Sequence, residues 1–195
     1  MKRNDSSGIE TNFEVRSLDA TISPEEYGKL PKNPLYIILD NLRSAFNVGA
    51  IFRLCDVMRV SGLFLCGYTA SPPHAKLEKT SLGTVSYVPW KKFGSALDAV
   101  LFLKNRGIPV WAAETTTTSV RYDHIPIPAE VGIVFGNEAL GVSREVLDLC
   151  DELVEIPVYG FKNSMNVATS CAVIGYKIIE KMQKKSPATG GCGTL

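Results

Sequence analysis

Three segments of this 195-residue sequence carry clusters of amide, carboxylate, guanidinium and hydroxyl groups among glycines. They run from Asp40 to Arg53, from Phe135 to Gly141, and from Ile156 to Ala168. In each segment, side chains that donate or accept hydrogen bonds stand beside residues small enough for a ligand to approach the backbone. We interpret the three segments as parts of one candidate functional site.

The first segment contains Asn47, Gly49 and Arg53 at the start of a predicted helix. Gly49 and Arg53 are four residues apart and share a helix face that is separate from the buried stripe of Val48 and Ile51. A glycine on the same face as an arginine leaves room for a ligand beside a positive charge. A structural interpretation is equally open, in which Asn47 caps the helix and Arg53 is a solvated surface charge.

The second segment has Gly136 and Gly141 on either side of the pair Asn137-Glu138. It is not a phosphate-binding loop, because the chain contains neither GxxxxGK[ST] nor GxGxxG and because a carboxylate repels phosphate. Glu138 is better suited to a cation or a hydroxyl group. Alternatively, Glu138 caps the helix that is predicted to begin near Ser143.

The third segment enters the last predicted helix with Ser164 and Asn166, which offer hydroxyl and amide groups. Ile156, Met165 and Val167 add apolar contact, and this mixture suits an adenine ring. The alternative is that Ser164 is only the N-cap of the helix.

The elements that position these segments follow from the alternation of apolar patterns along the chain. Short runs rich in Val, Ile and Phe predict five strands: Leu35–Leu39, Leu63–Cys66, Pro109–Ala113, Val131–Phe135 and Leu153–Val158. Helical periodicity predicts four helices: Asn47–Met58, Ser95–Arg106, Ser143–Leu149 and about Asn166–Lys184. This order predicts an α/β fold with a mostly parallel sheet and helices on both faces, whose sites lie at the carboxyl ends of the strands.

The chain divides by composition into a folded domain and two flanking segments. Residues 1–33 are polar with few periodic apolar positions, which predicts a loosely ordered N-terminal arm. The folded domain is expected over residues 34–185, and a hydrophobic content of 45% is enough to give the chain a buried core. The Gly-rich residues 186–195 are expected to form a flexible tail.

Composition also excludes several classes of function and location. The net charge of +1 identifies no partner, so any contact with a nucleic acid must come from local clusters. No apolar run approaches membrane-spanning length and residues 1–14 lack the apolar centre of a signal peptide, which predicts a cytoplasmic protein without a membrane partner. The five cysteines include no CxxC pair and there are only two histidines, so we expect no metal site.

Taken together and in this order, the three segments resemble the signature motifs of the SpoU (TrmH) family of RNA 2′-O-ribose methyltransferases, in the SPOUT superfamily. The NxGxxxR core of the first motif corresponds to Asn47, Gly49 and Arg53, and the GxExxG core of the second to Gly136, Glu138 and Gly141. The third motif, Ser-hydrophobic-Asn-Val, stands at residues 164–167. The resemblance covers about residues 35–184 and implies an α/β fold with a trefoil knot near the carboxyl end.

The resemblance also implies an activity, a cofactor and partners. The protein would transfer a methyl group from S-adenosylmethionine to a ribose 2′-OH of tRNA, or of rRNA, as a homodimer whose partner contributes to each site. The cofactor would bind in the knot against Ala113, Glu114, Thr115, Gly136, Asn137, Ile156, Ser164, Met165 and Asn166. The last predicted helix supports a dimer, because it carries apolar positions beyond what one sheet face needs: Val173, Ile174, Ile178 and Ile179.

By the same resemblance Arg53 activates the ribose hydroxyl, but a guanidinium group is a poor base at physiological pH. Arg53 could instead bind the target phosphate and stabilise the developing alkoxide, and both roles stay open. Glu138 could anchor Arg53 or Asn47, or take the proton through a water molecule. Asn47 could orient Arg53 or the ribose.

RNA contacts are expected from Arg43, beside the first segment, and from Lys76 and Lys79, which one helical turn would direct toward a backbone phosphate. A solvated surface turn is the rival interpretation of these lysines. Two other functions compete with the enzyme. A knotted RNA- or cofactor-binding module without catalysis would not need the intact polar residues of the motifs, and a flavodoxin-like nucleotide-binding protein would need a phosphate loop that this chain lacks.

Overall fold

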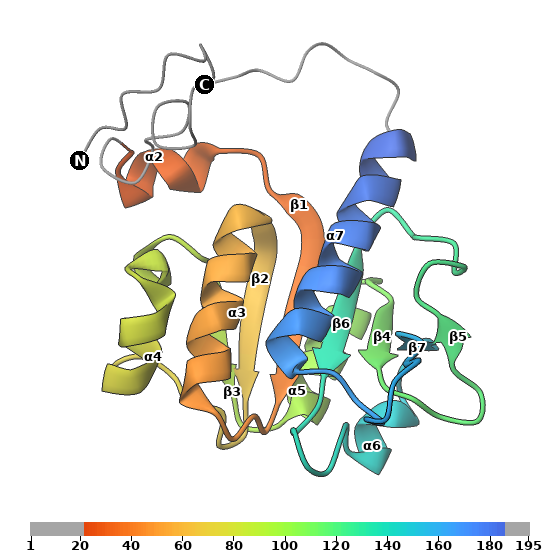
Figure 1. Ribbon diagram of the computed structural model, residues 1–195. Coiled ribbons are helices and arrows are strands. Elements are labelled where there is room, and N and C mark those ends of the chain that lie inside the picture. The colour runs from red at the N-terminus through yellow and green to blue at the C-terminus, as the bar shows by residue number, and fades with distance from the viewer. Residues whose placement is uncertain (1–21, 186–195) are drawn as a thin grey trace, which may run out of the picture. The chain divides into compact units, whose positions relative to one another are not determined.

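The computed structural model describes residues 22–185, which contain a seven-stranded sheet flanked by helices (Figure 1). The strand order is β3-β2-β1-β6-β4-β7-β5, and every pair of neighbours is parallel. The strands are β1 (Asn33–Asp40), β2 (Val60–Cys66), β3 (Trp90–Phe93), β4 (Val110–Ala113), β5 (Val120–Arg121), β6 (Val131–Phe135) and β7 (Glu152–Glu155). The parallel sheet confirms the predicted α/β class.

Helices cover both faces of this sheet, as predicted. They are α3 (Ala45–Val57), α4 (Ala75–Ser81), α5 (Ala96–Lys104), α6 (Arg144–Leu147) and α7 (Val167–Lys185), with a short 3-10 helix, η2 (Thr84–Ser86). Figure 1 shows α3 and α7 crossing one face and α5 on the other. Alternate residues of β1 enter the two cores, because Leu35 and Ile37 pack with α3 and α7 whereas Ile38 packs with α5. A strand that is buried on both faces has a continuous apolar run, which makes it visible in the sequence.

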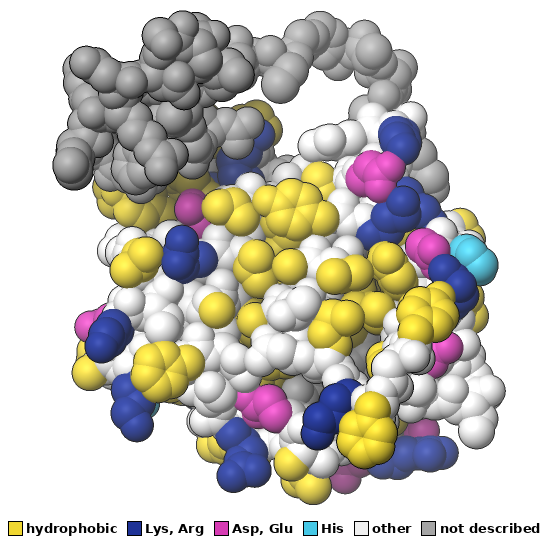
Figure 2. Space-filling model, viewed as in Figure 1, with side chains coloured by type: hydrophobic (Ala, Val, Ile, Leu, Met, Phe, Trp, Pro, Cys, Tyr) yellow, Lys and Arg dark blue, Asp and Glu magenta, His cyan; other side chains and the backbone are white. Residues whose placement is uncertain are grey.

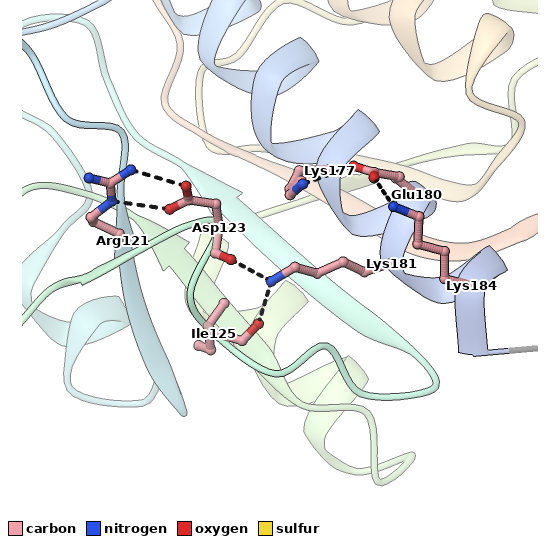
Figure 3. Close-up of polar contacts among 7 residues, drawn as sticks. All are labelled: Arg121, Asp123, Ile125, Lys177, Glu180, Lys181 and Lys184. Carbon is pink, nitrogen blue, oxygen red and sulfur yellow. Dashed lines mark hydrogen bonds and ion pairs between the residues drawn. The ribbon is translucent and has the colours of Figure 1, made fainter.

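The helix α7 is fixed to the rest of the domain along its length. Its first half buries Cys171 and Ile174. Its second half is held by Lys181, whose Nζ donates to the backbone carbonyl oxygens of Asp123 (2.7 Å) and Ile125 (3.0 Å) (Figure 3). The ion pairs within its last turns are exposed and contribute little. The start of α7, which enters the candidate site, is therefore carried on a firmly anchored helix.

The connection from β7 to α7 runs back across the sheet. The strand β7 lies beyond β4, yet α7 returns to pack against α3 and β1. Residues 156–166 therefore pass the carboxyl ends of β4 and β6 before α7 begins. This crossing is the place at which the expected trefoil knot would be tied.

The described residues divide into two units, residues 22–30 and residues 31–185. The described part of the first unit contains α2 (Pro24–Lys29), which Ser23 and Glu26 start with a reciprocal capping box. Part of the segment expected as a loosely ordered arm is thus helical, and β1 begins at Asn33, one residue before the expected domain start. Residues 1–21 of the arm and the expected tail at 186–195 lie outside the described residues.

The cysteine thiols of the described residues form no disulfide and have low reactivity. Cys55, Cys66 and Cys171 are buried. Burial raises the pKa of Cys66 and of Cys171 to about 12, so both stay protonated at neutral pH and are poor nucleophiles and poor metal ligands. Over residues 22–185 no three His, Cys, Asp or Glu side chains are grouped so that they could hold a metal ion. No helix in the same range combines the length and the apolar character that crossing a membrane requires.

Candidate functional site

The three polar segments follow the carboxyl ends of β1, β6 and β7 and meet at one edge of the sheet. There the second and third segments line a cavity of about 1030 Å³, whose walls come from the ends of β4, β6 and β7 and from the start of α7. The first segment is not part of the lining, but Asn47 joins it to the other two by hydrogen bonds. In parallel α/β sheets, ligands bind at this edge, where strand connections diverge to either side. The position of the cavity agrees with the expectation from the strand order.

All nine residues predicted to contact the cofactor line this cavity: Ala113, Glu114, Thr115, Gly136, Asn137, Ile156, Ser164, Met165 and Asn166. The lining also includes residues that sequence reasoning did not assign, among them Phe135, Val142, Leu147, Val154 and Lys162. Apart from Lys162, these are apolar residues, and no sequence pattern distinguishes them from ordinary core residues. Their presence gives the cavity an apolar floor beneath a polar rim.

Glu138 joins the second segment to the first. Its Oε2 accepts the backbone N–H of Arg43 (2.8 Å), and its Oε1 accepts the backbone N–H of Ser44 (3.1 Å) and the Asn47 Nδ2 (2.9 Å). Burial raises the pKa of the Glu138 carboxyl, but these donors together outweigh it, so the net pKa lies below its ordinary value. Glu138 therefore binds the residues at the start of α3, and the alternative that it caps α6 is wrong.

Asn166 links the third segment to the first. Its Nδ2 donates to the Asn47 Oδ1 (3.2 Å), while its Oδ1 accepts the backbone N–H of Ala168 (2.9 Å) and of Thr169 (3.3 Å). Asn166, rather than Ser164, is thus the residue whose side chain caps α7. At α3 the cap is Ser44, which accepts the Asn47 N–H (3.3 Å), so the alternative of Asn47 as a cap is also wrong.

The motif glycines are required by the chain's own packing. A Cβ atom at Gly49 would overlap the Thr80 side chain and the Leu77 carbonyl of α4, so the expected space for a ligand beside Arg53 is filled by a neighbouring helix. A Cβ atom at Gly136 would overlap the backbone of Gly141, across the tight turn between these two glycines. These glycines permit close approach of backbone to backbone, and Gly136 also lines the cavity.

Asn137 holds the second segment in shape through a buried amide. Its Nδ2 donates to the Asn41 carbonyl oxygen (2.7 Å) and to the Tyr68 hydroxyl (2.5 Å), and its Oδ1 accepts the backbone N–H groups of Ala139 and Leu140. Sequence reasoning included Asn41 in the first segment without assigning it a role, and it missed Tyr68. One feature of the sequence could have pointed to Tyr68. It follows the predicted strand Leu63–Cys66, and in a parallel sheet the residues after each strand lie at the same edge as the three segments.

Glu114 and the hydroxyl residues that follow it, Thr115–Ser119, shape the cavity wall that comes from the end of β4. The Glu114 carboxylate accepts the backbone N–H of Val142 (2.9 Å) and of Thr115 (3.2 Å). The Ser119 hydroxyl donates to the Glu114 carbonyl oxygen (2.8 Å) and accepts the N–H of Thr116 (2.7 Å). The hydroxyl run therefore folds into a local turn that fixes the cavity wall at residues 114–116.

The basic residues that were predicted to act on the ribose or to contact RNA lie outside this cavity. Arg53 is exposed, is not among the lining residues, and makes no ion pair or side-chain hydrogen bond within residues 22–185. The side chain of Arg43 is also exposed, although its backbone is fixed by Glu138. Lys76 and Lys79 are exposed on α4, so the helical turn predicted for them is present.

The apolar positions of α7 do not form the surplus that the sequence suggested. Ile174, Ile178 and Ile179 are buried in the protein's own core, and Val173 is half-buried. The helix α7 packs on both α3 and β1, so it buries a wider apolar face than a helix that packs on a sheet alone. The 3.6-residue periodicity of the sequence did not reveal this second contact. These residues therefore no longer argue for a dimer.

Comparison with known proteins places this site in a family. The SpoU rRNA Methylase family matches residues 34–176, a range that contains all three motifs. A tRNA (guanosine(18)-2'-O)-methyltransferase of Aquifex aeolicus is 31% identical over 152 residues, which cover 77% of this chain and 71% of that protein.

Two solved structures share the fold. The A. aeolicus TrmH/SpoU tRNA modifying enzyme has a TM-score of 0.74 and 27% identity, covering 83% of this chain and 82% of its own. An AdoMet-bound rRNA methyltransferase from Sinorhizobium meliloti has a TM-score of 0.72 and 26% identity, covering 77% of this chain and 57% of its own. The second and third motifs line one cavity, Asn47 of the first motif is hydrogen-bonded to both, and the family match covers all three, so the chain belongs to the SpoU rRNA methylase family.

Proposed function

We propose that this protein is an S-adenosylmethionine-dependent methyltransferase that acts on a ribose 2′-OH of RNA, with tRNA as the first candidate substrate and rRNA as the second. The observation that carries the proposal is the cavity at the carboxyl edge of the sheet, lined by all nine residues that the family resemblance predicts to contact the cofactor. The named activity of the A. aeolicus relative and the AdoMet bound to the S. meliloti relative support it. We expect this activity in the cytoplasm, where these RNAs are modified.

The cavity suits S-adenosylmethionine in size and in chemistry. Its volume of about 1030 Å³ is at the upper end of the range for small-molecule pockets. Ile156 and Met165 offer apolar contact to an adenine ring, and the carboxylates of Glu114 and Glu155 give the wall a negative charge that suits a sulfonium cation. When bound, S-adenosylmethionine supplies the methyl group, and no metal ion is needed for its transfer.

The polar residues of the motifs have different tasks in this proposal. Glu138 is a poor proton acceptor, because its pKa is lowered and both of its oxygens already accept hydrogen bonds. We assign to it the anchoring of Asn47, which connects Glu138 to Asn166 and so aligns the first and third segments. Arg53 then has the task of binding the target phosphate or stabilising the negative charge that develops on the ribose oxygen.

The position of Arg53 supports the proposal of a homodimer. Since this side chain is exposed and does not line the cavity of its own chain, it would act at the cavity of a second copy. Figure 2 shows hydrophobic side chains gathered on the face formed by α3 and α7. Its exposed members include Phe46 and Val57 of α3 and Tyr176 of α7. We propose this face as the interface, because exposed apolar patches of this kind mark association sites.

Methyl transfer from labelled S-adenosylmethionine to unmodified tRNA and rRNA transcripts tests the function. The expected product is a ribose-methylated nucleotide, identified by mass spectrometry after digestion, with a chelator present throughout. Label found on a base instead of a ribose would contradict the proposal. Binding of cofactor and RNA without any transfer would favour the catalytically inactive knotted module.

A further inference from the structure

The short turn after β2, residues 67–70, lies beside the motif segments and has no assigned role. Tyr68 in this turn is 61% exposed, although it stands among firmly held groups. Its backbone N–H donates to the Asn41 Oδ1 (3.1 Å), and its hydroxyl accepts the Asn137 Nδ2 (2.5 Å). Asn41 and Asn137 belong to the first two segments of the candidate site. The ring is therefore held at both ends at the edge of the site while its surface faces solvent.

The neighbours of Tyr68 make the turn rigid. The buried Thr69 hydroxyl accepts the Leu42 N–H (2.9 Å) and donates to the Leu39 carbonyl oxygen (3.2 Å), and Lys92 donates from the edge strand β3 to the Thr69 carbonyl oxygen. On the other side, Gly67 has a φ of +58° and packs directly on the Asn41 side chain. A ring presented on such a turn loses little conformational entropy when it binds a partner.

Packing does not explain why this position carries an aromatic ring. A hydroxyl that only fixes Asn137 would not need a large apolar surface left in water, and a ring that served the core would be buried. An exposed aromatic face beside a site for RNA is the kind of surface on which an unpaired nucleobase stacks. Arg43, with its exposed guanidinium two residues after Asn41, adds a positive charge for the adjoining phosphate.

We propose that the ring of Tyr68 stacks on an unpaired nucleobase next to the methylated ribose, so that Tyr68 is a substrate-contact residue. This inference rests on the proposed function. Tyr68 then has two roles: its hydroxyl binds Asn137 of the second segment, and its ring contacts the RNA. The prediction concerns affinity for RNA and leaves the chemistry of transfer to the motif residues.

The test compares Tyr68→Phe and Tyr68→Leu, which both lack the hydroxyl and differ in the ring. Each variant is assayed for its thermal midpoint, its Kd for S-adenosylmethionine, and its Kd and KM for the transcript that the wild-type protein methylates. Loss of a base stack should raise the RNA Kd and KM of Tyr68→Leu about 5- to 100-fold above those of Tyr68→Phe. The two variants should bind S-adenosylmethionine equally, and Tyr68→Trp should match Tyr68→Phe in RNA affinity.

Equal RNA affinity in the Phe and Leu variants would overturn the stacking role and leave Tyr68 as a positioning residue for Asn137. That outcome would not affect the proposed function, because the wild-type protein would still methylate its RNA. If the wild-type protein methylates no RNA, the proposed function fails and this inference fails with it. A loss of folding confined to Tyr68→Leu would show in its thermal midpoint, and the comparison of Tyr68→Trp with Tyr68→Ala then decides the role of the ring.

Discussion

The role of Glu138 depends on the groups that its oxygens accept, which a sequence does not display. In the sequence it is a carboxylate between two glycines, suited to a cation, a hydroxyl or a helix start. In the folded protein its oxygens receive two backbone N–H groups and the amide of Asn47. Such contacts stabilise the charged carboxylate, so the residue is better suited to holding two loops together than to moving a proton.

This arrangement predicts how stability depends on pH. The folded protein lowers the pKa of Glu138, so this carboxylate stabilises the fold above its unfolded-state pKa of about 4.3, and the contribution is lost as pH falls through the lower folded value. Glu138→Gln should therefore lower the thermal midpoint at pH 7, and the difference from wild type should shrink below about pH 4. Glu152→Gln, which removes an exposed carboxylate, is the control. A difference that stays constant from pH 7 to pH 3 would contradict this role.

Arg53 is the residue whose substitution should separate chemistry from cofactor binding. Since its side chain does not line the cavity of its own chain, Arg53→Ala should leave the Kd for S-adenosylmethionine unchanged. The loss of a positive charge near the developing alkoxide should lower the rate of methyl transfer about 10²- to 10³-fold, measured under single-turnover conditions. Arg53→Lys keeps the charge, so substantial retained activity would favour charge stabilisation over a role specific to guanidinium. A near wild-type rate for Arg53→Ala would show that the assignment is wrong.

At the scale of elements, the sequence predicted what is long or buried and missed what is short and exposed. The strand β6 has the predicted bounds, and α7 differs by one residue at each end. The strands β3 and β5 were missed, because they are short edge strands whose exposed residues, such as Lys91 and Lys92, interrupt any apolar run. The strand β7 ends at Glu155, before Pro157, which cannot donate to a sheet, so it is shorter than predicted.

The candidate site was predictable to the extent that it depends on chain order. The carboxyl ends of parallel strands meet at one edge, so motifs that follow such strands must converge, and all nine predicted residues share one cavity. The functions of the glycines were not predictable. Gly49 meets Thr80, which follows it by 31 residues, and no local pattern encodes that contact between α3 and α4.

The packing of α3 on α4 makes a prediction of its own. Gly49→Ala would place a methyl group against Thr80 and the Leu77 carbonyl, and such overpacking should lower the free energy of unfolding by about 1–3 kcal/mol. Urea unfolding measures this change. The control is Gly28→Ala, which should not lower the free energy of unfolding, because no atom lies near the added methyl group. Cofactor affinity should survive in Gly49→Ala. Unchanged stability with lost ligand binding would restore the interpretation that Gly49 makes room for a ligand.

At the scale of the whole molecule, the proposed function requires Arg53 to reach a cavity that this residue does not line. The cavity is well formed, but Arg53 lies on the exposed surface of α3 and outside it. The exposed apolar residues of α3 and α7 share one face, so two copies that associate there would bury this face together with the surroundings of Arg53. The proposed dimer therefore has a consequence for catalysis, beyond the expected mass of twice 21.3 kDa.

Mixing two defective variants tests that consequence. Arg53→Ala keeps an intact cavity but lacks the arginine. Asn166→Ala keeps Arg53 but loses the hydrogen bond to Asn47, and we expect it to bind the cofactor weakly because Asn166 lines the cavity. In a mixed dimer, the intact cavity of the first chain would receive Arg53 from the second. After subunit exchange of equal amounts, half of the dimers are mixed and each has one of its two sites complete, so about a quarter of wild-type activity should return. The assay is run at a low S-adenosylmethionine concentration that leaves the Asn166→Ala cavity largely empty. Activity that remains the average of the two parent variants would mean that Arg53 serves the cavity of its own chain.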